Sequence, residues 1–243
     1  MRLLDLFCGA GGASVGYARA GFSVVGVDIH PQPNYPFEFV QMNALSCDYE
    51  YLDQFDIIHA SPPCQQYSIG SAVARKNGKQ YPDLVHPTRR LLVATGKPYI
   101  MENVRPAPVR PDICLDGTMF DLGVIRPRVF ETNIPGIPTY PCPSLIEGSV
   151  IEGDYVTVAG NGGTGLKTRA AWSQAMGIHW MSRRELREAI PPAYTRWIGQ
   201  EALLILEAGT DLHCVRHAVA ASNPRVLPVP KTGIAVPIRL PGF

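Results

Sequence analysis

The sequence has few of the features that mark several protein classes. Its 243 residues contain no apolar run that approaches the roughly 20 residues needed to span a bilayer. The six cysteines, at positions 8, 47, 64, 114, 142 and 214, form no CxxC or similar short pair. The first residues, MRLLDLF, read as a strand and show no signal-peptide pattern. We therefore interpret the cysteines as reduced thiols and the protein as cytoplasmic, with no membrane partner.

An excess of charge of one sign is also missing. The chain has 22 basic and 21 acidic residues and a formal net charge of +1, so any contact with a polyanion has to be local. The histidines are scattered, and the one cluster, His213, Cys214 and His217, has no second cluster to supply further ligands. The length predicts a single domain over residues 1–207 followed by a proline-rich C-terminal tail over 208–243, and the scattered histidines predict no metal site.

The first hundred residues alternate strand-like and helix-like segments. We expect strands over residues 2–7, 23–29, 37–42, 55–61 and 97–104, and helices over 11–21 and 84–96, the second broken early by Pro87. Such alternation with apolar strands predicts an α/β fold with a mostly parallel, doubly wound sheet. The carboxyl ends of its strands should meet at one edge, which would bring together residues 5–9, 28, 61–65 and 102–104.

A glycine-rich turn follows the first expected strand. Gly9, Gly11 and Gly12 precede a helix, where backbone can approach a ligand closely. Asp28 ends the second strand about 20 residues later, the position from which an acid binds the ribose of a nucleoside cofactor. The glycines alone are explained equally well by a structural turn, but the pair favours a nucleoside cofactor. No GKS or GKT follows, which disfavours phosphate binding.

Cys64 lies in the stretch SPPCQQYS, after two prolines that stiffen the approach to it. A lone cysteine is usually an inert small apolar residue. Glu102 changes this interpretation, because it ends the fifth expected strand at the same edge. A thiolate that adds to C6 of a pyrimidine turns C5 into a nucleophile, and an acid at N3 stabilises the charge that develops. The pair therefore predicts alkylation of a pyrimidine carbon.

Five motifs, in this order, resemble those of one known family, the cytosine-5 DNA methyltransferases: DLFCGAGG (5–12), GVDI (26–29), PPCQQYS (62–68), ENV (102–104) and RPRVF (126–130). The resemblance covers residues 1–130 and implies a Rossmann-like methyltransferase fold with S-adenosylmethionine as cofactor. It implies that Cys64 is the nucleophile, that Glu102 contacts N3, and that Arg126 and Arg128 orient the base.

The resemblance also implies the binding residues. Phe7 would stack on the adenine, Asp28 would bind the ribose, and Asn43 stands near the family's adenine-reading aspartate. The whole cofactor set is Phe7, Gly9, Gly11, Gly12, Asp28, Ile29, Asn43 and Pro62. The substrate set is Gln65, Ser68, Asn103, Lys167 and Arg169.

The second half departs from the family pattern. Only about 40 residues separate RPRVF from the next helical segment, too few for an independent recognition domain, so we expect a minimal variable region over about 131–171. Within it, Lys167 and Arg169 lie in a glycine-rich stretch that is either a loop over a polynucleotide backbone or an ordinary surface loop. The segment AIPPAY resembles the family's closing segment, with a capping box from Ser182 to Glu185 before it.

On that alignment Arg187 and Glu188 replace an uncharged glycine and asparagine beside the cofactor's methionine end. A charge there is costly unless it is paired or exposed. One hypothesis is that the pocket takes a modified donor such as carboxy-S-adenosylmethionine; the alternative is a local misalignment with ordinary chemistry.

The leading prediction is a transferase that modifies C5 of cytosine in DNA with low sequence specificity. Three alternatives stay open: the same chemistry on RNA or a free cytosine nucleotide, a catalytically idle nucleic-acid binder, and a dehydrogenase that uses a similar glycine turn. A binder needs neither Cys64 nor Glu102, and a dehydrogenase leaves Cys64 and the two arginines unexplained.

Overall fold

The computed structural model describes residues 1–139, 155–158 and 168–208. In these ranges the chain forms a seven-stranded sheet with the order β3-β2-β1-β4-β5-β7-β6. The strands are β1 (Arg2–Leu6), β2 (Ser23–Asp28), β3 (Glu38–Gln41), β4 (Ile57–Ala60), β5 (Tyr99–Asn103), β6 (Ile113–Leu115) and β7 (Arg128–Thr132).

Strands β1 to β5 are parallel, and β7 is antiparallel to both of its neighbours, β5 and β6. The chain winds from β1 outward to β2 and β3, returns to β4 beside β1, and continues outward to β5. The carboxyl ends of β1 and β4 therefore flank the point where the winding changes direction, which is where ligands bind in open α/β sheets. This confirms the predicted α/β fold with a mostly parallel, doubly wound sheet.

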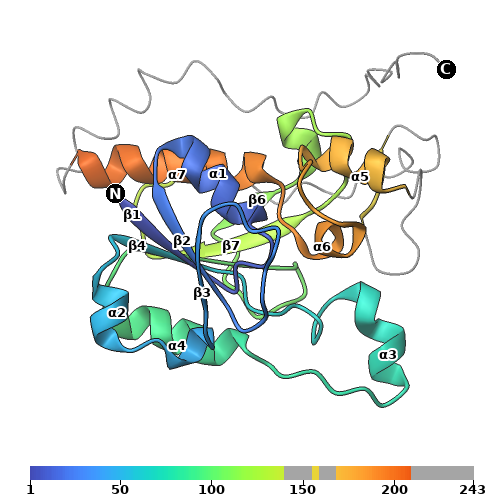
Figure 1. The fold of residues 1–243 in the computed structure, drawn as a ribbon, viewed down its shortest axis with the longest axis horizontal. Coiled ribbons are helices and arrows are strands. Elements are labelled where there is room, and N and C mark those ends of the chain that lie inside the picture. The colour runs from blue at the N-terminus through green and yellow to red at the C-terminus, as the bar shows by residue number, and fades with distance from the viewer. Residues whose placement is uncertain (140–154, 159–167, 209–243) are drawn as a thin grey trace.

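The helices are α1 (Gly12–Ala20), α2 (Tyr49–Asp53), α3 (Ala72–Lys76), α4 (Val85–Thr95), α5 (Arg169–Met176), α6 (Arg183–Glu188) and α7 (Pro192–Glu207), with 3-10 turns η1 (Ala44–Ser46), η2 (Ile69–Ser71) and η3 (Gly117–Phe120). Helices α1 and α7 lie side by side on one face of the sheet, and α2 and α4 cover the other (Figure 1). Helices α5 and α6 lie near the carboxyl edge, and α3 projects away from the body (Figure 1).

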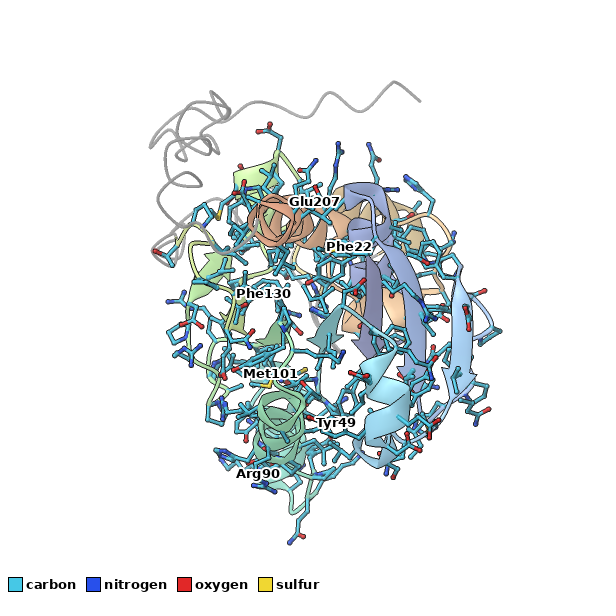
Figure 2. The ribbon with its side chains drawn as sticks, turned by 90° about the vertical axis from the view of Figure 1, so that its left-hand side faces the viewer. Phe22, Tyr49, Arg90, Met101, Phe130 and Glu207 are labelled. Carbon is cyan, nitrogen blue, oxygen red and sulfur yellow. The ribbon has the colours of Figure 1, made fainter. Side chains whose placement is uncertain are left out.

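Each face of the sheet has its own apolar core because side chains alternate along every strand. Along β5, Ile100 packs toward α1 and α7, whereas Met101 packs toward α2 and α4. Figure 2 shows the same arrangement, with Met101 beside the helix of Arg90 and Phe130 toward the helix that ends at Glu207. A third cluster joins Trp172 of α5 to Ala10 of the glycine turn, so the later part of the chain packs on the predicted cofactor loop.

Most of the predicted local features in the described residues are present. The five expected strands are there, and the capping box between Ser182 and Glu185 starts α6. Pro192 is the first residue of α7, where its missing N–H has no intrahelical partner to lose. The expected early break at Pro87 was wrong: Pro87 lies in the first turn of α4, which continues to Thr95, because the first N–H groups of a helix are unpaired in any case.

One further expectation was wrong, and others concern residues outside the described ranges. Cys114 is disulfide-bonded, so the interpretation of all six cysteines as reduced thiols was wrong for that residue; Cys8, Cys47 and Cys64 are free. The predicted tail after residue 208, Lys167, and most of the variable region lie outside the described residues. Among the helices that the structure describes, none has the length and apolar character of a membrane span.

Candidate active site

The carboxyl ends of three neighbouring strands are held together by short backbone contacts. The Cys8 amide donates to the Val27 carbonyl at 3.1 Å, and the Ser61 amide donates to the Leu6 carbonyl at 3.1 Å. The segments after β1, β2 and β4 therefore meet at one edge. The four segments that the sequence predicted to converge are brought together there, since β5 joins them through Asn103, described below.

Asp28 is fixed at the end of β2 by two backbone donors. The Gly9 amide lies 3.1 Å from Asp28 Oδ2, and the His30 amide lies 2.9 Å from Oδ1. Each carboxylate oxygen has a second lone pair, so the group remains able to accept from ribose hydroxyls. These bonds tie the glycine turn directly to the acid that the sequence pairs with it.

The turn after β1 has the backbone geometry of a ligand loop. Phe7 and Gly9 both have positive φ, 60° and 50°, and a non-glycine residue such as Phe7 adopts that conformation rarely outside functional sites. A Cβ placed on Gly9 would meet nothing within 4 Å, so the loop leaves space on that side. Gly11 precedes α1 with φ 82°.

The turn is closed from behind by the AIPP segment. A Cβ on Gly12 would lie 2.5 Å from the Ile190 carbonyl oxygen, so only glycine fits at that position. Trp180 Nε1 donates to the Ala10 carbonyl at 2.8 Å. The segment that the resemblance assigns to closure of the cofactor pocket thus lies directly against the glycine turn.

Ile29 and Asn43, the remaining predicted cofactor residues on this side, lie at the rim. Ile29 is 57% exposed, a large value for an isoleucine that directly follows a buried strand. The Asn43 side-chain oxygen accepts from the Leu45 amide at 3.0 Å and caps the 3-10 turn η1. That bond fixes the orientation of the Asn43 carboxamide.

Cys64 begins a tight turn directly after Pro62 and Pro63. Its carbonyl accepts from the amides of Tyr67 at 2.9 Å and Ser68 at 2.8 Å. Burial raises the pKa of the Cys64 thiol, while the positive charges of Arg128 and Arg126 lower it. The thiol is therefore protonated at rest, with two cations placed to stabilise the thiolate.

Glu102 is the buried carboxyl of the site. It is 5% exposed, and its Oε1 lies 2.9 Å from Arg128 Nε, without the alignment of a hydrogen bond. Burial raises the pKa of Glu102, and Arg128, Arg126 and Ser61 act against that shift. A raised pKa favours the protonated carboxyl, which can give its proton to a ring nitrogen.

Arg126 and Arg128 differ in what they contact. Arg126 is 4% exposed, and its guanidinium donates to the carbonyls of Val158 at 2.6 Å, Arg187 at 2.7 Å and Ala189 at 2.9 Å. Burial lowers its pKa to about 9, so it remains a cation at neutral pH. Arg128 instead faces Glu102, so it is the arginine in contact with the predicted catalytic carboxyl.

The predicted substrate residues after Cys64 are ordered by one arginine. Arg75 Nη1 donates to the Gln65 carbonyl at 2.6 Å and to the Ser68 carbonyl at 2.9 Å, which fastens the turn to α3. Asn103 Nδ2 donates to the Pro62 carbonyl at 2.9 Å and so joins β5 to the segment that carries Cys64.

Arg169 lies apart from this group. It starts α5 and donates to the carbonyls of Met181 at 2.8 Å and His179 at 3.0 Å. The structure therefore uses its guanidinium within the α5–α6 region, and the predicted contact with a polynucleotide backbone stays a prediction.

Sequence reasoning assigned no role to three buried polar groups beneath the site, although it expected residues 5–9 at the edge. Asp5 and His59 are neighbours on β1 and β4 and are both 0% exposed, and Tyr17 of α1 contacts His59. The available signal was a polar residue in the middle of an otherwise apolar strand, at 5 in RLLDLF and at 59 in FDIIHAS. Among the described residues, no group of three potential metal ligands is present.

The order and direction of the strands give the fold: the sheet has the Rossmann-like arrangement found in S-adenosylmethionine-dependent methyltransferases. Among the solved structures that share this fold are three methyltransferases. They are a protein described as a DNA modification methyltransferase encoded within a prophage (E. coli; 15% identity, TM-score 0.58, 85% of this chain and 99% of that chain), S. pombe Dnmt2 methyltransferase (12%, 0.58, 85% and 99%) and the Entamoeba histolytica methyltransferase EhMeth (10%, 0.56, 84% and 98%).

The sequence gives a narrower comparison. Residues 1–107 match the family model for the C-5 cytosine-specific DNA methylase. The match spans the part of the chain that carries the glycine turn, Cys64 and Glu102, and the matched family is a family of enzymes. A comparison with curated proteins found no match.

Proposed function

We propose that this chain transfers a methyl group from S-adenosylmethionine to C5 of cytosine in DNA, through a covalent bond between Cys64 and C6 of the base. One observation carries the proposal. The Cys64 thiol, the buried Glu102 carboxyl and Arg128 lie in one electrostatic cluster at the sheet edge that also holds the glycine turn and Asp28. That cluster provides a nucleophile, a proton donor and a cation in one place.

The edge fits the cofactor. Asp28, held by the amides of Gly9 and His30, would bind the ribose, and Phe7 and Ile29 would contact the adenine. The open side of Gly9 leaves space for a ligand against the turn. S-adenosylmethionine supplies the electrophilic methyl carbon that an activated cytosine C5 would attack.

The residues of the chain would activate the base in three ways. The Cys64 thiol would lose its proton to solvent, its sulfur would form a bond to C6, and the electron pair of the C5–C6 double bond would move toward C5. Glu102 gives its proton to N3, which neutralises the charge on the ring. Arg128, 2.9 Å from Glu102, stabilises the carboxylate that remains. Once C5 carries the methyl group, loss of the C5 proton to solvent, return of the N3 proton to the Glu102 carboxylate and cleavage of the Cys64–C6 bond would restore the aromatic ring.

DNA is the substrate we propose. The matched family is named for DNA, and the prophage-encoded protein of similar fold is described as a DNA modification enzyme. The near-neutral charge of +1 requires contacts with a polyanion to be local and favours the alternative below, whereas the short variable region favours modification of DNA in a short sequence context. RNA or a free cytosine nucleotide is the alternative substrate.

A covalent trap tests the chemistry. The purified protein is incubated with S-adenosylmethionine and with DNA, RNA or a nucleotide that carries 5-fluorocytosine, which cannot lose its C5 substituent as a proton. We expect a DNA adduct with the wild type and with Cys47→Ala, a control at another free buried cysteine, and none with Cys64→Ala. Adducts with RNA or nucleotide alone would reassign the substrate. No adduct with any carrier would indicate an idle binder.

Mass spectrometry of the modified nucleoside identifies the group that is added. Incubation with S-adenosylmethionine should give 5-methylcytosine, and incubation with carboxy-S-adenosylmethionine tests the modified donor. Sequencing of the modified DNA reports the context, and a required motif of about five or more base pairs would contradict low specificity.

A further inference from the structure

A chain of buried polar groups leads from helix α1 to the carboxyl of the site. The Tyr17 hydroxyl lies 2.9 Å from His59 Nδ1, and His59 Nε2 lies 2.8 Å from Ser61 Oγ. Tyr17 and His59 are both 0% exposed. The cytosine-5 chemistry described above does not account for these groups.

The strand register places the end of this chain beside Glu102. Strand β4 presents Ile57 and His59 to the face that α1 covers, and Ser61 follows at the same spacing. Ala60 pairs with Met101 of β5, so the next position in register sets Ser61 beside Glu102. A hydrogen bond with Ser61 also lowers the pKa of Glu102, as a donor to the carboxylate does.

The hydrogen bonds fix the tautomer of His59. Burial lowers the pKa of His59 to about 3, so the ring is neutral and has one donor and one acceptor. Burial also raises the pKa of Tyr17 well above its ordinary value, so Tyr17 keeps its hydroxyl hydrogen. Within the described residues the structure gives that hydrogen one acceptor, His59 Nδ1, and the ring hydrogen is therefore on Nε2.

This tautomer determines the direction of the hydrogen bond between His59 and Ser61. His59 Nε2 donates to Ser61 Oγ, so the Ser61 hydroxyl hydrogen remains for another acceptor. The neighbouring Glu102 carboxylate is such an acceptor. If the tautomer were reversed, Ser61 would donate to His59 and Glu102 would lose this donor.

We propose that His59, held by Tyr17 in the tautomer with the hydrogen on Nε2, orients the Ser61 hydroxyl toward Glu102 and acts as a positioning residue for that carboxyl. The role of Glu102 as the N3 proton donor is part of the proposed function, on which this inference rests. The chain Tyr17–His59–Ser61 favours the ionised carboxyl and limits how high burial can raise its pKa. It therefore sets the pH range in which Glu102 carries its proton.

Other groups also act on Glu102. From β7 and the segment before it, Arg128 and Arg126 lower its pKa. Glu102 in turn raises the pKa of Asp5 on β1 and of Cys64 after β4. A test has to change Tyr17–His59–Ser61 while leaving these charges in place, and removal of a single hydroxyl does so.

Two hydroxyl deletions and one control form the experiment. In protein labelled with 13C at the glutamate carboxyl, the Glu102 resonance is assigned by its loss in Glu102→Gln, and its pKa is followed by NMR. We expect Ser61→Ala to raise that pKa by about one unit and Tyr17→Phe to raise it by less. Tyr99→Phe should leave it unchanged, because it removes a buried hydroxyl on β5 that bonds to Glu131.

A second NMR readout examines the histidine directly. In 15N-histidine-labelled protein, His59 should be neutral with its hydrogen on Nε2 from about pH 5 to 8. Tyr17→Phe should change the Nδ1 shift, whereas Tyr99→Phe should not. A His59 that titrates near its ordinary pKa, or that carries the hydrogen on Nδ1 in the wild type, overturns the proposal. So does a Glu102 pKa unchanged in Ser61→Ala.

The adduct assay separates this inference from the proposed function. If the alkaline limb of adduct formation, where Glu102 loses its proton, moves to higher pH in Ser61→Ala in parallel with the Glu102 pKa, both stand. If the NMR shifts appear but no carrier forms an adduct, the link between Tyr17–His59–Ser61 and Glu102 stands and the proposed function fails. If adducts form with the same pH profile in all variants, the positioning role fails and the proposed function stands.

Discussion

On the β1–β2 side of the sheet edge, Asp28 is held by two backbone amides, whereas on the β4–β5–β7 side Glu102 is buried against Arg128 and above a layer of polar side chains. The first side is organised by main-chain geometry, including the positive φ of Phe7. The second is organised by charges in the protein interior, where each one depends on its neighbours. Changes on the first side should therefore affect cofactor affinity, and changes on the second should affect rate, protonation or stability.

The largest expected effect is on the β4–β5–β7 side of the edge. Glu102→Gln removes the proton that we assign to N3 and should lower kcat by about 10²- to 10⁴-fold, the range for a general acid. Cofactor affinity should stay near the wild-type value, because Asp28 and the glycine turn are unchanged. Single-turnover kinetics and calorimetric titration of the cofactor measure the two quantities.

Glu201→Gln is the matched control for that experiment. Glu201 on α7 is also a buried glutamate, 4% exposed, whose pKa burial raises, but it lies in the helix layer. It should retain wild-type kcat. If Glu102→Gln were as active as this control, the assignment of Glu102 would be wrong.

Variants of the two arginines on the β4–β5–β7 side should have different effects, one on stability and the other on rate. Arg126→Lys cannot replace three guanidinium bonds to buried carbonyls and should lower the free energy of unfolding by about 2–4 kcal/mol. Arg128→Lys keeps the charge but loses the planar group near Glu102, and should lower kcat about 10- to 100-fold with little change in stability. Urea denaturation and kinetics on both variants distinguish them, and equal stability losses would contradict this division.

A change on the β1–β2 side should alter the affinity for the cofactor. Asp28→Asn replaces one carboxylate oxygen with a nitrogen that cannot accept, and weakens bonds to ribose hydroxyls. We expect cofactor affinity to fall about 10- to 100-fold, as for loss of a hydrogen bond to a charged group, while kcat at saturating cofactor changes little. Calorimetric titration against the wild type checks the first point. A large fall in kcat with unchanged cofactor affinity would contradict this assignment and indicate a role for Asp28 in catalysis.

The convergence of the strand ends could be predicted from the sequence more fully than the pairing of β7 and the buried side-chain contacts. Parallel strands end at one edge by rule, so the meeting of the segments around Asp28, Cys64 and Glu102 followed from strand order alone. The antiparallel β7 was missed because RPRVF was read as a motif, and its pairing with β5 depends on contacts distant in sequence.

Side-chain partners were less predictable for the same reason. RPRVF shows two equivalent arginines, and only the folded chain directs Arg126 to carbonyls of residues 158, 187 and 189. Similarly, His59 looks like an isolated polar residue in a strand until α1 supplies Tyr17. Hydrogen-bond partners separated by 32 or more positions leave no periodic pattern in the sequence.

The smallest effect concerns how two buried groups beneath the edge, Asp5 on β1 and His59 on β4, balance each other. Burial raises the pKa of Asp5 to about 7 and lowers that of His59 to about 3. Between about pH 4 and 6.5, folded Asp5 binds more protons than the unfolded chain does, so its contribution to stability falls as pH rises. Folded His59 binds fewer protons, so its contribution rises with pH over the same window. The two contributions oppose each other and leave a shallow net dependence.

Asp5→Asn removes one of these contributions and keeps an acceptor for Ser14, whose hydroxyl donates to Asp5 in the wild type. The free energy of unfolding should then increase with pH between about 4 and 6.5, with a slope of up to about 1.4 kcal/mol per pH unit from His59. At pH 8 the variant should be more stable than the wild type, because the Asp5 carboxylate, whose Oδ1 is buried without a partner, is no longer charged. Asp121→Asn, at an exposed position with φ 54° that asparagine tolerates, should keep the wild-type profile. Urea denaturation at several pH values measures all three proteins, and parallel profiles for Asp5→Asn and the wild type would show that the two buried groups are not in balance.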